Sequence, residues 1–153
     1  MGAVVTTYLE LSDPARIQPA RPVEAEIRRV EPPDGAVNRA FYEQVGADYA
    51  WIDHLDKDDR WWQAHAERVE TWVIGEDAGY YELLRDGGDV QIAYFGLRPG
   101  FHGRGLGGAL LEHALRRGFE LGGRVWVHTC SLDGPHALAN YRARGLVPYR
   151  VER

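Results

Sequence analysis

A glycine-rich stretch near the middle of the chain constrains its fold more than any other feature. It lies between an apolar run that ends at Leu97 and a segment with helical apolar spacing that starts near Gly105. This order predicts a strand, a turn, a loop and a long helix. Backbone N–H groups in the first turn of a helix have no partner within the helix, and glycines let a bulky anion approach them. We therefore expect a cradle for a phosphate or diphosphate here.

Two common phosphate-binding patterns do not fit this stretch. Gly103, Gly105 and Gly108 have the spacing of a dinucleotide-binding loop, but that loop follows the first strand of a parallel sheet, whereas three hairpin-like strands precede this one. The Gly-Lys-Ser/Thr of a P-loop does not occur in the sequence. A simpler interpretation is that the glycines only close a tight turn. Four glycines within residues 103–108 exceed what a turn requires.

The rest of the sequence predicts alternating strands and helices in a single domain, residues 1–153. Apolar residues at period two or 3.6, with Gly, Pro and Asp at the breaks, define the boundaries. The expected strands are Thr6–Leu11, Val23–Val30, Glu70–Gly75, Ala78–Arg85, Asp89–Leu97, Arg124–Thr129 and Leu146–Val151. The expected helices are Ala36–Val45, Asp58–Arg68, Gly105–Leu121 and Pro135–Ala143. Short turns between the three middle strands predict that these strands are antiparallel.

Composition and charge argue against several classes of protein. A formal net charge of −5 is unlike a general nucleic-acid binder, which needs clustered Lys and Arg. No apolar run is long enough to span a membrane, and the first residues lack the pattern of a signal peptide. Cys130 is the single cysteine, and the scattered histidines have no metal-ligand spacing. We therefore expect a cytoplasmic protein with no metal, no nucleic-acid partner and no membrane contact.

The glycine loop is part of a longer pattern. The pattern is a strand that ends in an apolar residue, then x-Pro-x-x-(Arg/Gln)-Gly-x-Gly-x-(Gly/Ala), then a long helix; its positions are held by Leu97, Pro99, Gly103, Gly105 and Gly107. After the next strand comes a second pattern, Asn-x-x-Ala-x-x-x-Tyr-x-x-x-Gly-Phe; its positions are held by Ala137, Tyr141 and Gly145. Together the two patterns resemble the GNAT superfamily of acyl-CoA-dependent N-acetyltransferases. The resemblance extends over about residues 23–151.

Three positions depart from the patterns of this family. His102 stands where the family usually has Arg or Gln, Gly134 replaces the Asn, and Leu146 replaces the Phe. The change at His102 is mild, because backbone amides hold most of the diphosphate. The family usually has one further strand after the position of Val151. We expect the extra N-terminal strand, residues 6–11, to fill that place or to pair elsewhere on the sheet.

The resemblance implies a fold and a cosubstrate. The fold class is α/β, with a mixed, mostly antiparallel sheet that has a splayed central strand pair and is flanked by helices. The pantetheine arm of acetyl-CoA would lie in the splay, between the strands Asp89–Leu97 and Arg124–Thr129. The residues that the resemblance assigns to acetyl-CoA are Phe95, Gly96, Leu97, His102, Gly103, Arg104, Gly105, Leu106 and Gly107.

The activity implied by the resemblance is transfer of an acetyl or other acyl group from acetyl-CoA to the primary amine of a small molecule. The amine would attack directly in a ternary complex. Tyr141 holds the family position of the general acid for the leaving thiolate, and a tyrosine hydroxyl is protonated at neutral pH. The alternative for the whole chain is a non-catalytic acyl-CoA sensor on the same fold, which His102 and Gly134 favour. Dimers are common in the family, so a homodimer is a further option.

The acceptor amine must lose a proton before it attacks, since an alkylammonium has a pKa of about 10.4. Either a general base removes the proton or the site selects the neutral amine. Glu82 is the first candidate base, because a carboxylate is unexpected beside Tyr80 and Leu84 on one face of a strand; the alternative is that it faces solvent. His128, acting through a water, is a second candidate. Cys130 as a covalent acyl carrier is the third, although buried cysteines are usually inert.

The segment from Tyr42 to Trp62 is rich in aromatic and acidic residues. In the family, the first pair of helices caps the acceptor site. An aromatic, acidic cap suits a cationic, partly apolar amine through cation–π contact and charge attraction. The alternative is a solvated run of charges with the tryptophans in the core. The sequence does not distinguish an amino acid, a polyamine, an aminoglycoside, an arylalkylamine or a protein N-terminus as the acceptor.

Overall fold

A single seven-stranded sheet forms the centre of the structure. The computed structural model describes residues 4–47, 49, 51–133 and 135–153. The strands are β1 (Thr6–Leu11), β2 (Ile27–Arg29), β3 (Glu70–Ile74), β4 (Gly79–Asp86), β5 (Asp89–Leu97), β6 (Val125–Cys130) and β7 (Val147–Glu152). They lie in the order β2-β3-β4-β5-β6-β1-β7, and β5 and β6 are the one parallel pair among the described strands. The predicted mixed, mostly antiparallel α/β fold is confirmed.

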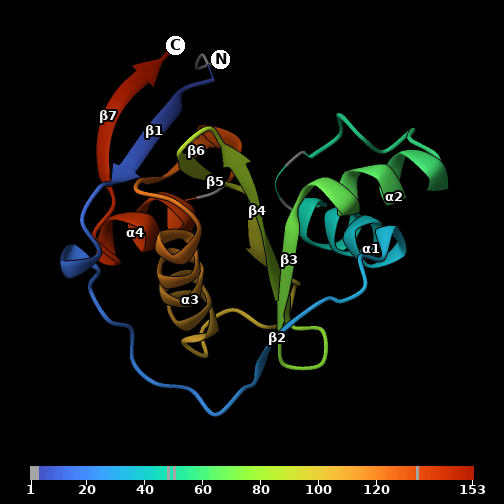
Figure 1. Cartoon of the computed structure of the whole chain (residues 1–153), viewed down its shortest axis with the longest axis horizontal. Helices are drawn as coiled ribbons and strands as arrows, with labels where there is room; N and C mark the ends of the chain where they lie inside the picture. Colours follow the sequence, from blue (N-terminus) through green and yellow to red (C-terminus); the bar gives the residue numbers. More distant parts are fainter. Residues whose placement is uncertain (1–3, 48, 50, 134) are drawn as a thin grey trace.

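Helices cover both faces of this sheet. Within the described residues they are α1 (Gly35–Gly46), α2 (Asp59–Arg68), α3 (Leu106–Leu121) and α4 (Pro135–Ala143), with short 3-10 turns η1 (Pro14–Arg16) and η2 (Ser131–Asp133). Figure 1 shows α1 and α2 on one face and α3 and α4 on the other. A large apolar cluster fills the α3 side, and a smaller one with Phe41 and Tyr80 fills the α1 side. Over the described part of the chain, no helix is both long and apolar enough to cross a bilayer.

Residues at the helix starts explain where the helices begin. The Asp34 carboxylate accepts a hydrogen bond from the Ala36 N–H (3.1 Å) ahead of α1. The Asp58 carboxylate accepts one from the Trp61 N–H (2.9 Å) ahead of α2. Gly105 precedes α3 in a left-handed conformation and makes no side-chain cap. The start of α3 therefore keeps its backbone N–H groups available, unlike the starts of α1 and α2.

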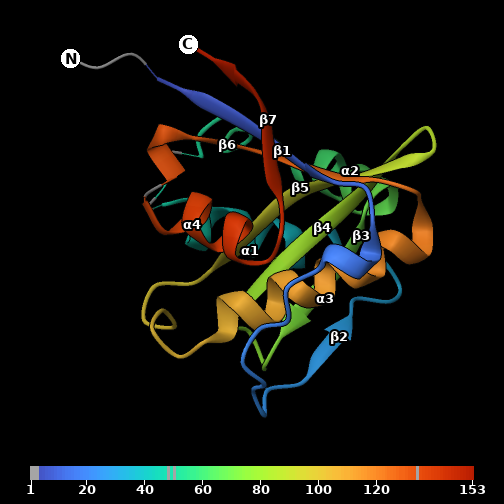
Figure 2. The ribbon, with the colours of Figure 1, turned by 90° about the vertical axis from the view of Figure 1, so that its left-hand side faces the viewer.

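The N-terminal strand β1 is an internal strand of the sheet, between β6 and β7 (Figure 2). It is antiparallel to both; Thr6 pairs with Cys130 on one side and with Glu152 on the other. Leu9 and Leu11 point into the core and are buried. The strand thus joins the sheet, and it pairs with β6 along the whole length of β6.

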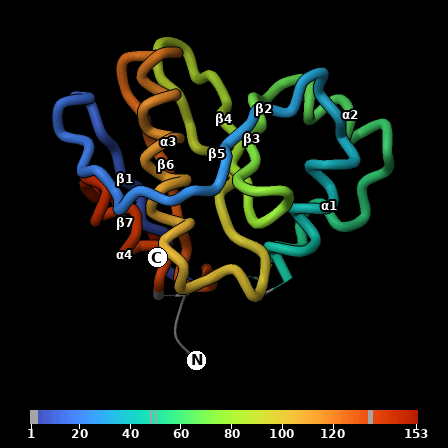
Figure 3. Tube along the Cα trace, turned by 90° about the horizontal axis from the view of Figure 1, so that it is seen from below, coloured from blue at the N-terminus to red at the C-terminus, as the bar shows by residue number. Residues whose placement is uncertain are grey.

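The segment between β1 and β2 wraps around the outside of α3, as the tube in Figure 3 shows. The Ala20 N–H donates to the Glu112 carboxylate of α3 at 2.7 Å. The expected strand Val23–Val30 is shortened to Ile27–Arg29. The reason is that Ile27 pairs with Ile74, the last residue of β3, so earlier residues run past the end of their only neighbour. Val23 and Ala25 still pack against the core, as their alternation predicted.

Candidate functional site

The two central strands, β5 and β6, separate soon after they start. They pair only at Val90–Val125 and Gln91–Trp126. Ala93 is then an extra residue in β5, because Glu82 pairs with Tyr94 while Leu83 pairs with Ile92. Such a bulge bends a strand away from its neighbour. The predicted splay is confirmed, and it leaves the second half of β5 without a strand on the β6 side.

The backbone of β5 faces this splay at alternate residues. The Arg98 N–H donates to the Ala78 carbonyl of β4 at 2.8 Å. Backbone groups in an antiparallel strand alternate in direction, so Gly96 also faces β4, whereas Phe95 and Leu97 face the gap. Phe95 and Leu97 can therefore pair with an extended ligand as with an added strand. Gly96 has a packing role as well: a Cβ there would lie 2.4 Å from Val45 Cγ1 of α1.

A cavity of about 1080 Å³ fills the splay. Its lining residues on β5 and the glycine loop are residues 92–97, His102, Gly103, Gly105, Leu106 and Gly107. From α1 and the segment after it come Tyr42, Tyr49, Trp51, Ile52 and Asp53. From β1, β6, η2 and α4 come Thr6, Tyr8, Val127, His128, Cys130, Leu132, Asp133, His136, Ala137, Asn140 and Tyr141. The cavity is thus bounded by elements from both sides of the splay.

The glycine loop forms one end of this cavity. Gly103 and Gly105 have φ of +82° and +77°, values that disfavour any residue with a Cβ. The Ala109 N–H is bonded to the Gly105 carbonyl (3.3 Å), so the N–H groups of the residues between them have no partner within α3. They lie at the positive end of the helix dipole, which favours an anion. Eight of the nine residues expected to bind acetyl-CoA line the cavity.

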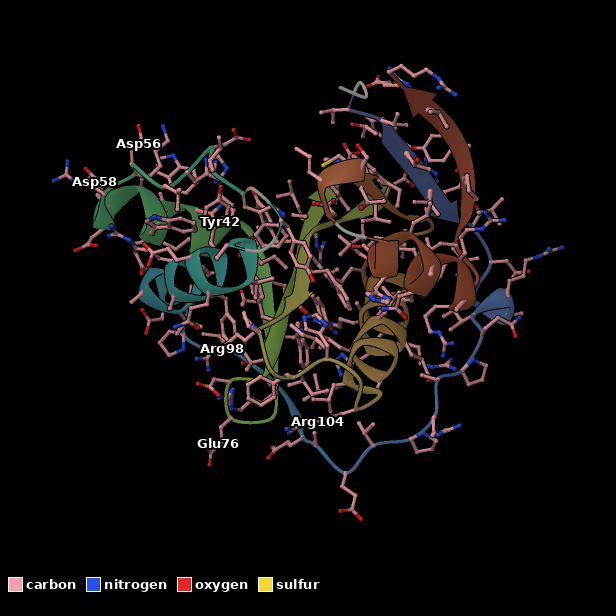
Figure 4. All side chains as sticks on the ribbon, turned by 180° about the vertical axis from the view of Figure 1, so that it is seen from behind. Tyr42, Asp56, Asp58, Glu76, Arg98 and Arg104 are labelled. Atoms are coloured by element: carbon pink, nitrogen blue, oxygen red, sulfur yellow. The ribbon has the colours of Figure 1, made fainter. Side chains whose placement is uncertain are left out.

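Arg104 is the exception among those nine residues. Its side chain is exposed, and its guanidinium lies 5.5 Å from the centre of the Phe101 ring. It is not among the described residues that line the cavity, and Figure 4 shows it at the outer edge of the loop. A residue that sequence reasoning missed is Asn140, whose side-chain amide donates to the Gly107 carbonyl at 3.1 Å. Asn140 ties α4 to the start of α3 and so fixes the loop against Tyr141.

Tyr141 lies on α4 and lines the cavity opposite β5. Its ring is 6.0 Å from the ring of Phe95, edge to face, and the residue is only 6% exposed. Burial raises the pKa of Tyr141 well above its usual value, and the negative charge of Asp133 raises it further. The hydroxyl therefore keeps its proton at neutral and mildly alkaline pH. Tyr141 comes from the second sequence pattern, and Gly134, the Asn position of that pattern, lies outside the described residues.

Glu82 lies on β4 and is 1% exposed, so it does not face solvent. Its carboxylate accepts hydrogen bonds from Asn38 Nδ2 (2.8 Å) and His65 Nε2 (2.6 Å). Asn38 also donates to Thr71 Oγ1 at 2.9 Å. The network joins α1, α2, β3 and β4. Glu82 and His65 are not among the described residues that line the cavity.

The other two candidates for proton or acyl transfer, His128 and Cys130, both line the cavity from β6. His128 is exposed, and its ring lies 5.5 Å from the ring of Tyr8. The Cys130 N–H donates to Asp133 Oδ2 at 2.9 Å. Among the described residues, no group of three or more His, Cys, Asp or Glu is placed to hold a metal ion.

Only part of the aromatic and acidic segment reaches the cavity. Figure 4 shows Tyr42 between α1 and the segment that follows it, whereas Asp56 and Asp58 lie at the outer end, away from β5. Trp62 is buried among the helices, and Asp58 caps α2. The cavity wall formed by these aromatic residues is completed by Tyr94 of β5, which sequence reasoning missed. Tyr94 is the cross-strand partner of Glu82, a pairing that depends on the bulge at Ala93 and that the strand pattern does not indicate.

Comparisons with known proteins agree with this geometry. Residues 30–146 match the model of the acetyltransferase (GNAT) family. The GCN5-related N-acetyltransferase of Sphaerobacter thermophilus has a similar structure, with a TM-score of 0.74 and 17% identity over 97% of this chain and 49% of that one. The GCN5-related N-acetyltransferase of Kribbella flavida has a TM-score of 0.67 and 18% identity, over 96% of this chain and 55% of that one. This chain therefore spans about half the length of these two relatives.

A third similar structure contains bound CoA. The Bacillus subtilis acetyltransferase in complex with CoA has a TM-score of 0.60 and 20% identity, over 80% of this chain and 76% of that one. No curated protein matches the sequence. The family match covers most of the chain, and the sheet, the splay and the glycine loop agree with it. The chain therefore belongs to the GNAT family of acetyltransferases.

Proposed function

We propose that this chain transfers an acyl group from acetyl-CoA to the primary amine of a small molecule, with both substrates bound in the cavity of the splay. The observation that carries the proposal is that the groups suited to bind the acyl donor lie together in one cavity. These groups are the gap-facing backbone of Phe95 and Leu97, the free N–H groups at the start of α3, and the hydroxyl of Tyr141.

The chemistry follows from these groups. The N–H groups of the loop would bind the diphosphate, and the backbone of β5 would pair with the pantetheine arm. A backbone N–H facing the gap can polarise the thioester carbonyl, as in an oxyanion hole. The neutral amine nitrogen then bonds to the acyl carbon, and the carbon–sulfur bond breaks. The thiolate takes the proton of Tyr141, and the proton that the nitrogen loses on becoming an amide passes through solvent to restore the Tyr141 hydroxyl. Holding both reactants in one cavity supplies much of the rate enhancement.

We propose a positioning role for Glu82 in place of direct contact with the amine. Through Asn38 and His65 its carboxylate fixes α1 and α2 against β4. Tyr42, which lines the cavity, is carried by α1. For deprotonation, His128 is the candidate on the cavity wall, acting through a water, and binding of the neutral amine is the other route. Cys130 also lines the cavity, but its thiol would have to lose its proton before it could carry the acyl group.

Two measurements test the proposed function. Calorimetry with CoA and acetyl-CoA tests binding, and release of free thiol in the presence of an amine panel tests transfer. We expect both binding and amine-dependent thiol release. Tight binding without thiol release across the panel would instead identify a non-catalytic acyl-CoA sensor. Absence of any binding by the folded protein would overturn both functions.

A further inference from the structure

We propose that the acceptor is a primary amine with an aromatic or branched hydrocarbon body and no carboxylate group. This inference rests on the proposed function, since it names the second substrate of the same cavity. It is drawn from three properties of the acceptor wall: its rings, its apolar entrance and the sign of its charges.

The rings of the acceptor wall form one continuous surface. Trp51 lies at its centre, 5.7 Å from the ring of Tyr42, 5.1 Å from that of Tyr94 and 6.1 Å from that of Tyr49. Tyr42 and Tyr94 also meet edge to face at 5.6 Å. These rings fix one another, so the wall is formed before a ligand arrives. A wall of this kind favours a flat or branched hydrocarbon, and it attracts an ammonium group through the faces of the rings.

The entrance to the cavity is apolar on two sides. Ile52, before α2, is 66% exposed, and Leu132, in η2, is 51% exposed. Both line the cavity, although side chains of this kind are usually buried. Trp51 Nε1 donates to Asp133 Oδ1 at 3.4 Å and so joins the two sides. A hydrocarbon body would cover the two exposed side chains and gain from their burial, whereas a strongly hydrated polyamine would not.

The charges near the aromatic wall disfavour a carboxylate on the acceptor. Asp53 and Asp133 line the cavity, and none of the other described lining residues is a Lys or Arg. The Asp133 carboxylate accepts hydrogen bonds from Thr129 and Cys130, which hold it in place at the cavity. The lining histidines come from the loop, β6 and α4 and not from the aromatic wall. An ammonium group is attracted here, whereas a carboxylate would be repelled and would find no cationic partner at that wall.

Matched pairs of substrates test this inference. Thiol release from acetyl-CoA is measured with phenethylamine against phenylalanine and with isoamylamine against leucine; the members of each pair differ only in the carboxylate. We expect kcat/KM to be about 100-fold higher or more for the amine of each pair. Spermidine serves as the hydrophilic cation and should be used less efficiently than phenethylamine. Amino acids used within tenfold of their amines, or a preference for spermidine, would overturn the inference.

A pair of variants tests whether the charge of the wall is responsible. Asp53→Arg places a cation at the entrance and should lower the amine-to-amino-acid ratio at least tenfold. Asp56→Arg makes the same change in charge three positions along the same segment, on an exposed residue outside the cavity, and should leave the ratio unchanged. An equal effect of both variants, or no effect of Asp53→Arg, would contradict the assignment of the charge to Asp53.

The failure of the inference and the failure of the proposed function give different results. If CoA binds but no amine of either kind releases thiol, the transferase function is wrong. Calorimetry of phenethylamine and phenylalanine with the CoA-saturated protein then still tests the acceptor wall, because binding does not require transfer. Tighter binding of phenethylamine would support the inference for a sensor, and equal or tighter binding of phenylalanine would overturn it.

Discussion

The two ends of the cavity are built from different parts of the polypeptide. At the donor end the ligand would meet backbone: the N–H groups after Gly105 and the gap-facing peptide groups of β5. At the acceptor end it would meet side chains: the rings of Tyr42, Trp51 and Tyr94 and the carboxylate of Asp53. Backbone geometry tolerates most changes of side chain, so we expect the loop to keep its function with His102 in place of the usual Arg or Gln. A wall of side chains changes its preference with each substitution.

The largest effect is expected at the backbone end. Gly105→Glu should raise the Kd for CoA by about 1000-fold, or about 4 kcal/mol, because a carboxylate would stand among the N–H groups that face the diphosphate. Gly87→Glu is the matched control: it also has a positive φ, +62°, and open space around it, but it lies in the turn between β4 and β5. The Kd for CoA of both variants is measured by calorimetry. A comparable loss of CoA affinity in both would mean that backbone strain, and not the position in the glycine loop, is responsible.

Tyr141→Phe should act on turnover and leave donor binding nearly unchanged. Removing the proton for the leaving thiolate should lower kcat by about 100-fold, with a similar Kd for CoA. Burial raises the pKa of this tyrosine, so its proton is retained as the pH rises. The wild-type rate should therefore show no loss from this group between pH 7 and pH 10. An unchanged kcat in the variant would remove the proposed acid.

Glu82→Gln should affect the acceptor end more than the donor end. Loss of the charge from the buried network should lower stability by about 1–3 kcal/mol. The helices that carry the aromatic wall would loosen, so the KM for the amine should rise several-fold while the Kd for CoA stays the same. Glu76→Gln, on the exposed turn after β3, is the matched control (Figure 4). A large fall in kcat with an unchanged amine KM would instead support Glu82 as the proton acceptor.

The smallest effect concerns a histidine outside both ends of the cavity. His113 of α3 is hydrogen-bonded to the Tyr81 hydroxyl at 2.7 Å, and burial lowers its pKa below the usual 6.5. The unfolded chain therefore binds the proton more readily, so this group's contribution to stability is complete above pH 6.5 and is lost as the pH falls. In His113→Gln, the fall in Tm between pH 7.5 and 5.5 should be smaller by about 2–4 °C. An identical fall in both proteins would contradict this.

The donor end could be predicted from the sequence because glycines and periodic apolar residues determine it locally. The expected helix Gly105–Leu121 and strand Asp89–Leu97 differ from α3 and β5 by at most one residue at an end. The acceptor end could not be predicted in this way. The segment between α1 and α2 has no periodic pattern, and its contacts with Tyr94 and Asp133 depend on tertiary packing.

Glu82 shows the same limit for a single residue. The sequence indicated correctly that a carboxylate on this strand is unusual, and the alternative of a solvent-facing side chain is wrong, since the residue is buried. What the strand pattern could not indicate is the partner. Asn38 and His65 are far from Glu82 in the sequence and reach it only because α1 and α2 pack on the same face of β4. The sequence can thus show that a residue is unusual without showing which residues it contacts.

The position of β1 has a consequence for how the molecule assembles. Leu11 pairs with Val125 and Thr6 pairs with Glu152, so the partners of β1 lie on the order of a hundred residues away along the chain. Closing such long loops is slow, and until then β1 has no sheet to join. We expect amide protons of β1 and β7 to become protected from exchange last during refolding. The β6 side of the cavity would then form after the glycine loop, so the loop would be in place before the cavity beside it is closed.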